Sequence, residues 1–227
     1  MQIRTITCGQ SNVYLLYHDN TGILIDTGTD KYKEKIVECC WYVKIRLIVL
    51  THGHFDHCQN AAYLARQLNC FVGIAKEDEA LLANHQKRKV FGKGLWSRFY
   101  AWVSNCSIRT RKIEAVTPDV ILEEGMSLEA YGIDGEIVRL AGHTEGSVGV
   151  RLASGELFVG DAMQNILFPA AAWCYEDEAQ AMNSVKKIRD MDVAKLFFGH
   201  GKSMERKRDK RKGMNGMMNG GNSCTQF

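Results

Sequence analysis

The chain has 227 residues, of which 45% are hydrophobic and 24% are charged, proportions typical of a soluble globular protein with a sizeable core. It holds no run of about eighteen apolar residues, so no transmembrane helix is expected, and its start lacks the apolar stretch of a secretory signal. The net charge of +3 arises in segment 202–212, which holds seven Lys or Arg and two Asp or Glu. We therefore expect a cytoplasmic protein with a slightly acidic body.

The first third of the chain alternates between strand and helix patterns. A helix over about 31–40 precedes an apolar strand at 46–50, a helix at 60–68 and a strand at 70–74. Such alternation predicts an α/β protein. Before these elements, turns containing Gly, Asn and Asp separate three expected strands, QIRTITC, NVYLLYH and GILID.

Segment 77–117 interrupts this pattern, because it is helical in character, basic and rich in aromatic residues. A helix is expected at 177–191 and a last strand at 194–201. Five further strands are expected in DVILEEG, MSLEAYG, GEIVRLAG, SVGVRLA and ELFVG. The pattern predicts one domain over 1–201 with a helical insertion at 77–117, followed by a basic, low-complexity tail at 202–227.

Three of the seven histidines fall in the stretch THGHFDH, residues 51–57. His52, His54, Asp56 and His57 directly follow a predicted strand, where functional groups gather in α/β sheets. Crowded imidazoles repel one another when protonated, and each needs hydrogen-bond partners when buried and neutral. Imidazole combined with carboxylate suits zinc, iron or manganese. A metal site is therefore favoured over a solvated histidine cluster.

The pattern HxHxDH resembles the signature of the metallo-β-lactamase superfamily, whose members are αββα four-layer sandwiches that carry one or two metal ions. Four further motifs occur in the order that this resemblance implies. GILIDTG supplies Asp26, LAGHTEGSVG supplies His143, LFVGDAM supplies Asp161 and LFFGHG supplies His200. The matching motifs extend over nearly the whole predicted domain, which strengthens the resemblance.

The resemblance implies a site with two divalent metal ions, most consistent with zinc, with iron or manganese as alternatives. One ion would be held by His52, His54 and His143, and the second by Asp56, His57 and His200. Asp161 would bridge the two ions, and Asp26 would orient a ligand. A metal-bridging hydroxide would then attack the substrate, with Asp56 also handling a proton.

Within the superfamily, the ligand set is similar to that of hydroxyacylglutathione hydrolases (glyoxalase II), lactonases and transfer-RNA 3′-processing nucleases. We expect a small (thio)ester or lactone as substrate. The alternatives are a phosphodiesterase or nuclease, and a metal-bearing binding module without catalysis. The chain departs from the lactonases, which carry a Tyr shortly after the bridging Asp, because Asp161 is followed here by Ala162, Met163 and Gln164. Tyr175 could take that role from a neighbouring loop.

Segment 77–117 is expected to cover the metal pocket. Trp96, Phe99 and Trp102 would form an apolar wall, while four cations could attract an anionic substrate. Those cations are Lys87, Arg88, Lys89 and Arg98. An amphipathic hairpin packed on the sheet and a homodimer interface remain alternatives. The basic tail lacks interleaved aromatic residues, so nucleic acid is not favoured as a partner. The eight cysteines include no CxxC pair and are expected to be free thiols.

Overall fold

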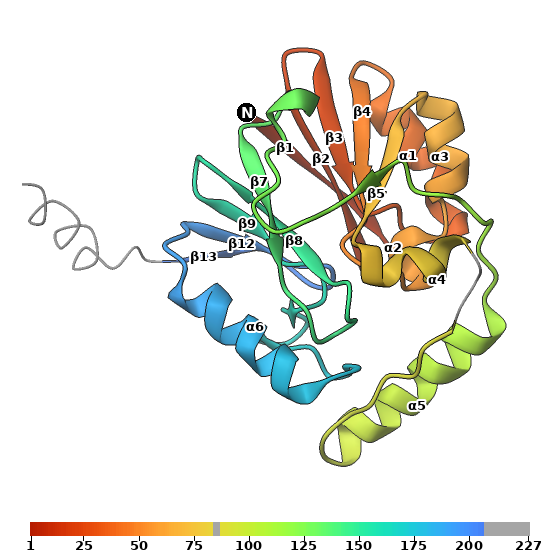
Figure 1. The fold of residues 1–227 in the computed structure, drawn as a ribbon, viewed down its shortest axis with the longest axis vertical. Helices are drawn as coiled ribbons and strands as arrows, with labels where there is room; N and C mark the ends of the chain where they lie inside the picture. Colours follow the sequence, from red (N-terminus) through yellow and green to blue (C-terminus); the bar gives the residue numbers. More distant parts are fainter. Residues whose placement is uncertain (84–86, 207–227) are drawn as a thin grey trace, which may run out of the picture.

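The computed structural model describes residues 1–83 and 87–206. Two sheets pack face to face between two layers of helices (Figure 1). The first sheet has the strand order β1-β2-β3-β4-β5-β6. β1 to β3 pair antiparallel, and β3 to β6 pair parallel. Its strands are β1 (Gln2–Cys8), β2 (Ser11–His18), β3 (Thr21–Ile25), β4 (Lys44–Val49), β5 (Phe71–Ile74) and β6 (Val120–Ile121).

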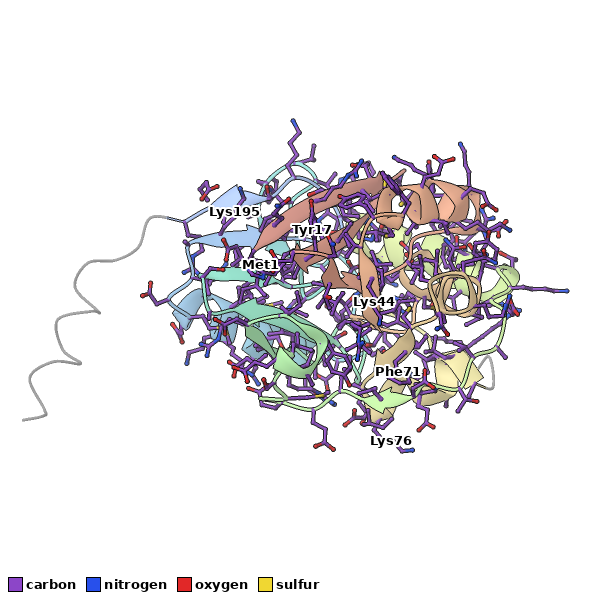
Figure 2. The ribbon with its side chains drawn as sticks, turned by 90° about the horizontal axis from the view of Figure 1, so that it is seen from above. Met1, Tyr17, Lys44, Phe71, Lys76 and Lys195 are labelled. Atoms are coloured by element: carbon purple, nitrogen blue, oxygen red, sulfur yellow. The ribbon has the colours of Figure 1, made fainter. Side chains whose placement is uncertain are left out.

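The second sheet has the order β13-β12-β9-β8-β7. Its strands are β7 (Gly135–Arg139), β8 (Val148–Leu152), β9 (Glu156–Phe158), β12 (Lys195–Phe197) and β13 (Met204–Glu205). Seen from above, Lys195 of this sheet lies on one side of the molecule, and Lys44 and Phe71 of the first sheet lie on the other (Figure 2). A short separate ribbon joins β10 (Met163–Gln164) to β11 (Ala170–Ala171).

Alternating side chains explain why the inner strands of the first sheet are buried on both faces. On β2, Val13 and Leu15 pack towards the helical layer, whereas Tyr14 and Leu16 pack towards the second sheet. A strand directs successive side chains to opposite faces, so a continuous apolar run fits between two layers. This burial fixes the register of the strand.

Helices cover the outer face of each sheet, which completes four layers. α1 (Lys33–Cys40) and α3 (Ala61–Leu68) pack on the first sheet through Ile36 and Leu64. α6 (Glu178–Asp190) packs on the second sheet through Val185 and Ile188. The Asp177 side chain caps α6 by accepting a hydrogen bond from the Gln180 amide. The predicted αββα sandwich is confirmed.

The described part of segment 77–117 contains the helices α4 (Glu79–Ala83) and α5 (Leu95–Thr110), and residues 84–86 lie outside the described part of the chain. α4 lies beside α2 (Phe55–Cys58), and α5 extends away from the two sheets (Figure 1). Residues 111–117 are not helical. The insertion is therefore helical only in part.

One prediction of local structure was wrong. The stretch MSLEAYG forms a 3₁₀ helix at Glu129–Tyr131, because Gly132 takes a positive φ of 84° and turns the chain back into β7. The start of the expected tail contains β13, which pairs with β12. The rest of that tail, 207–227, lies outside the described residues. In the described part of the chain, no helix is long and apolar enough to cross a membrane.

Candidate metal centre

The histidines and carboxylates lie where the ends of strands from both sheets converge. Ile25 and Val49 are paired at the ends of β3 and β4, so Asp26 and Thr51 leave the first sheet at the same edge. The second sheet reaches this edge through the Val148 amide, which donates to the Thr51 carbonyl at 2.8 Å. The fold thus brings residues that are far apart in the sequence into one cluster.

Seven predicted ligand residues are brought together in three overlapping groups. Within each group, one donor atom per residue lies within 4.8 Å of the others. His52 belongs to two groups and His57 also belongs to two. The groups are His52 with His54 and His143, His52 with His57 and Asp161, and Asp56 with His57 and His200.

The outer ring nitrogens of three histidines are held by protein acceptors, which turns their Nε2 atoms towards the centre. His57 Nδ1 lies 2.8 Å from Asp26 Oδ2. His143 Nδ1 lies 2.8 Å from the Cys174 carbonyl, and His200 Nδ1 lies 2.8 Å from the Gln10 carbonyl. Hydrogen bonds of this kind fix the tautomer and orientation of imidazoles that bind metal.

The inner ring nitrogens face one another across the centre. His54 Nδ1 lies 3.0 Å from His143 Nε2, and His57 Nε2 lies 3.3 Å from His200 Nε2. Within the described residues, His52 Nε2 and Asp161 Oδ1 are buried with no hydrogen-bond partner. Such unpaired buried atoms are costly unless something else satisfies them.

The spacing of these atoms fits metal coordination. Asp161 Oδ2 lies 3.2 Å from His200 Nε2 and 3.5 Å from His143 Nε2, and Asp56 Oδ2 lies 3.4 Å from His200 Nε2. Two donors that are each about 2.1 Å from a tetrahedral ion lie about 3.4 Å apart. The nitrogen and oxygen donors also suit divalent zinc, iron or manganese. The residues present therefore fit the metal ions that the family implies.

The pKa values within the cluster are set by burial and by the charged neighbours of each group. Burial, together with His143, lowers the pKa of His54 to about 3, so its lone pair stays free at neutral pH. Burial opposes ionisation of Asp56, but His57 and His200 outweigh it and lower the pKa to about 2. For His57, burial likewise opposes the charge, but Asp161 and Asp26 raise the pKa to about 9. The carboxylates thus attract positive charge to the centre.

Asp26 anchors the cluster from beneath, as expected for a residue that orients a ligand. It is 1% exposed and takes a positive φ of 62°, which is rare outside glycine. Its carboxylate accepts a hydrogen bond from the Thr51 amide at 2.8 Å and lies 2.8 Å from His57. The strained backbone aims one carboxylate at two parts of the histidine loop.

Asp78 is a buried residue that the sequence patterns did not single out. Its carboxylate accepts hydrogen bonds from the Gly53 amide at 2.9 Å and from the Thr144 hydroxyl at 2.7 Å. Gly53 lies between two predicted ligands, and Thr144 follows a third. Arg88 forms an ion pair with the same carboxylate. Asp78 thus connects the loop that carries His52 and His54 with the loop that carries His143. No local sequence motif indicates this role, because Thr144 lies 66 residues away from Asp78.

A pocket opens beside the cluster. Gln164 lines it, is 4% exposed and has a side-chain nitrogen without a hydrogen-bond partner in the described part of the chain. α5 forms one wall, through side chains that recur on one helical face. The wall residues are Tyr100, Val103, Ser104, Ser107 and Ile108.

The expected apolar wall is not formed by the three aromatic residues that the sequence suggested. Trp96, Phe99 and Trp102 are 85%, 59% and 63% exposed and do not line the pocket. Tyr175 is buried outside it, where its backbone pairs with Phe91. The prediction that these three residues form the wall is wrong, because the face of α5 towards the metal cluster carries Tyr100 with Ser and aliphatic side chains instead.

The four cations that were expected to attract an anionic substrate lie in different places. Lys87 and Arg88 line a second, adjoining cavity, whereas Lys89 and Arg98 line neither of these two cavities. Arg88 is half-buried and occupied with Asp78 and Glu176. Fewer of these cations are therefore available to a substrate than the sequence suggested.

Comparison with known proteins places this arrangement in a family. The model of the metallo-beta-lactamase superfamily matches residues 6–200, and the chain belongs to that superfamily. It is thus a member of a superfamily of metal-dependent hydrolases, with a candidate metal-binding cluster of His and Asp.

Two relatives align along most of the chain. A probable metallo-hydrolase of Methanocaldococcus jannaschii is 28% identical over 205 residues, covering 86% of this chain and 90% of its own length. The hydroxyacylglutathione hydrolase GloC of Haemophilus influenzae is 26% identical over 168 residues, covering 72% and 71%. Both names describe hydrolases.

Two solved structures share the fold. BLEG-1, a B3 metallo-beta-lactamase, superposes with a TM-score of 0.69 at 21% identity, covering 90% of this chain and 94% of that chain. TTHA1623, solved in a di-iron-bound form, gives a TM-score of 0.64 at 24% identity with the same coverage. At these identities the likeness concerns the fold alone.

Proposed function

We propose that the protein is a dinuclear metal-dependent hydrolase that acts on a small (thio)ester or lactone, in the manner of the hydroxyacylglutathione hydrolases. The observation that carries the proposal is the chain of three donor groups linked through His52 and His57. A single ion would need only one such group. Linked groups suit two neighbouring ions with a shared carboxylate, Asp161.

The proposed ligands of each ion are taken from the three donor groups described above. His52, His54 and His143 would hold one ion, Asp56, His57 and His200 the other, and Asp161 both. When bound, the ions supply Lewis acidity and lower the pKa of a coordinated water towards neutrality. We favour zinc, while the di-iron form of a structural neighbour supports iron as an alternative.

The remaining polar groups have distinct roles in this proposal. Asp56 lines the pocket with its side chain 26% exposed, so it can accept a proton from the attacking water. The free amide nitrogen of Gln164 can donate a hydrogen bond to the substrate carbonyl or to the leaving group. Tyr100 and Ile108 limit solvent access on the α5 side.

The substrate class is supported by the pocket and by one relative. The pocket beside the donors combines apolar walls with a few polar groups, as small-molecule sites do, and a relative along 72% of the chain is named as a hydroxyacylglutathione hydrolase. The phosphodiesterase alternative shares the same donor set. The non-catalytic alternative keeps the ions but predicts no turnover.

A substrate panel tests the proposal. Hydrolysis of S-lactoylglutathione, an acyl-homoserine lactone and bis-p-nitrophenyl phosphate is compared with the wild type and with His52→Ala. We expect turnover of the thioester or lactone, and loss of both bound metal and turnover in His52→Ala. Turnover of the phosphodiester alone would reject the substrate class, and bound metal without any turnover would support the non-catalytic module.

A further inference from the structure

A second cavity adjoins the metal pocket and is lined by cations. His54, Phe55 and Ile108 belong to the walls of both. Lys87 and Arg111 also line it. Since Phe55 stands between His54 and Asp56 in the sequence, the cavity begins beside the donor cluster.

Two of the cations in this cavity have no carboxylate partner in the described part of the chain. Arg88, the third cation, is paired with Asp78 and Glu176. The Arg111 guanidinium instead lies over the Phe55 ring, 5.8 Å from its centroid. The Lys87 ammonium donates one of its three hydrogens to the Arg109 carbonyl.

The described walls of the cavity contain no acidic side chain that would neutralise these charges. The Arg111 guanidinium lies within cation–π range of the Phe55 ring, and its N–H groups have no carboxylate partner in the described part of the chain. A guanidinium edge presents parallel donors that match a carboxylate. A free ammonium on the same wall adds a second positive charge for the same anion.

We propose that this cavity binds a carboxylate of the substrate, with Arg111 as the main contact and Lys87 as a second. The inference rests on the proposed function. The scissile carbonyl would lie at the donor cluster, and the carboxylate would reach past Phe55 to Arg111. The preferred substrate is therefore an anionic (thio)ester or lactone, in which a short linker separates the two groups.

A matched pair of esters tests the subsite. The mono-4-nitrophenyl ester of adipic acid and 4-nitrophenyl hexanoate have the same acyl length and leaving group, but only the adipate carries a distal carboxylate. We expect the metal-loaded full chain to show a KM for the adipate lower by about tenfold, as one charge-assisted contact would give. Equal KM values for the two esters would overturn the proposal.

Variants locate the effect. Arg111→Ala is expected to raise the KM for the adipate about tenfold and to leave the hexanoate kinetics unchanged, with partial retention in Arg111→Lys. Lys112→Ala is the matched control, since it removes the same charge from an exposed neighbour that does not line the cavity. An equal effect of Lys112→Ala, or equal effects of Arg111→Ala on both esters, would overturn the subsite.

Binding measurements separate this proposal from the proposed function. If neither ester is hydrolysed, the proposed function fails, and calorimetry compares adipate with hexanoate on the zinc-loaded protein. Both ligands offer one carboxylate to metal, but only adipate offers a second. Tighter adipate binding that Arg111→Ala removes supports the subsite, and equal affinities reject it. Loss of single-stranded RNA binding in Arg111→Ala, with adipate binding intact, would assign the cavity to a polymer instead.

Discussion

At the scale of single residues, the site depends on carboxylates that hold imidazoles in place. Asp26 shows this most clearly, because a buried side chain in a strained backbone conformation contacts both Thr51 and His57. Such strain persists only where surrounding structure enforces it. The orientation of His57 should therefore depend on the charge of Asp26.

Asp26→Asn is expected to weaken metal binding at the group of Asp56, His57 and His200 by about tenfold to a hundredfold. The amide keeps the shape but loses the charge that orients the His57 ring. Competition with a chromophoric chelator measures the affinity, and circular dichroism checks the fold. Asp30→Asn, in the exposed turn that follows, should leave the affinity unchanged. Unaltered metal affinity in Asp26→Asn would contradict this role.

Cysteine reactivity gives a second prediction at this scale. Burial raises the pKa of Cys40 and Cys174 to about 12 and raises the pKa of Cys58 well above its usual value. Thiols that are protonated and buried react slowly. Treatment of the native protein with a disulfide reagent should modify exposed Cys106 and spare these three, with all four reacting in denaturant. Peptide mapping identifies the modified positions, and rapid labelling of Cys174 would contradict the structure.

At the scale of elements, loops from the two sheets form one site because Asp78 joins them. Asp78→Asn is expected to lower affinity at the group of His52, His54 and His143, while the group of His57 and His200 retains its ion. It should also lower the free energy of unfolding by about 3 kcal/mol, because Arg88 would lose a buried partner. Metal titration distinguishes one retained equivalent from two. Glu79→Gln is the control, and equal weakening of both ions would reject the selective role.

The orientation of α5 makes a further prediction. Trp102 faces solvent, whereas Tyr100 lines the pocket. Trp102→Ala should therefore change kcat/KM less than twofold, and Tyr100→Ala should change it about tenfold through lost substrate contacts. Steady-state kinetics with the preferred ester decide between them. A larger effect of Trp102→Ala than of Tyr100→Ala would mean that Trp102 faces the pocket.

These elements also show how far the sequence could be interpreted. Strands such as β2 and β8 were predictable from local apolar patterns, and the residue types and spacing of the HxHxDH motif were sufficient to indicate metal chemistry. The role of Asp78 was not predictable, because it depends on contacts made across the fold. The inward face of α5 was misjudged because hydrophobic side chains need not be buried on a helix that extends from the body.

At the scale of the whole molecule, the proposed ions join the two halves of the sandwich. His52, His54 and His57 follow the first sheet, whereas His143, Asp161 and His200 follow strands of the second. Ligands that bind only the folded state stabilise it by mass action. Removal of metal should therefore affect the stability of the entire domain.

Chelation is expected to lower the melting temperature by about 10 °C or more, since an ion at a thousand times its Kd contributes about 4 kcal/mol and each kcal/mol corresponds to a few degrees in a domain of this size. Differential scanning calorimetry measures the shift, and zinc added back should reverse it. In His52→Ala, chelation should lower the melting temperature by a smaller amount than in the wild type. An unchanged melting temperature would mean that the donors do not bind metal tightly in the folded protein.

The most direct test of the dinuclear centre is an anomalous difference map from crystals of the zinc-loaded protein. Two peaks are expected, one among His52, His54 and His143 and one among Asp56, His57 and His200, with Asp161 beside both. A map without a peak in this cluster, or with a single peak at full occupancy, would contradict the account.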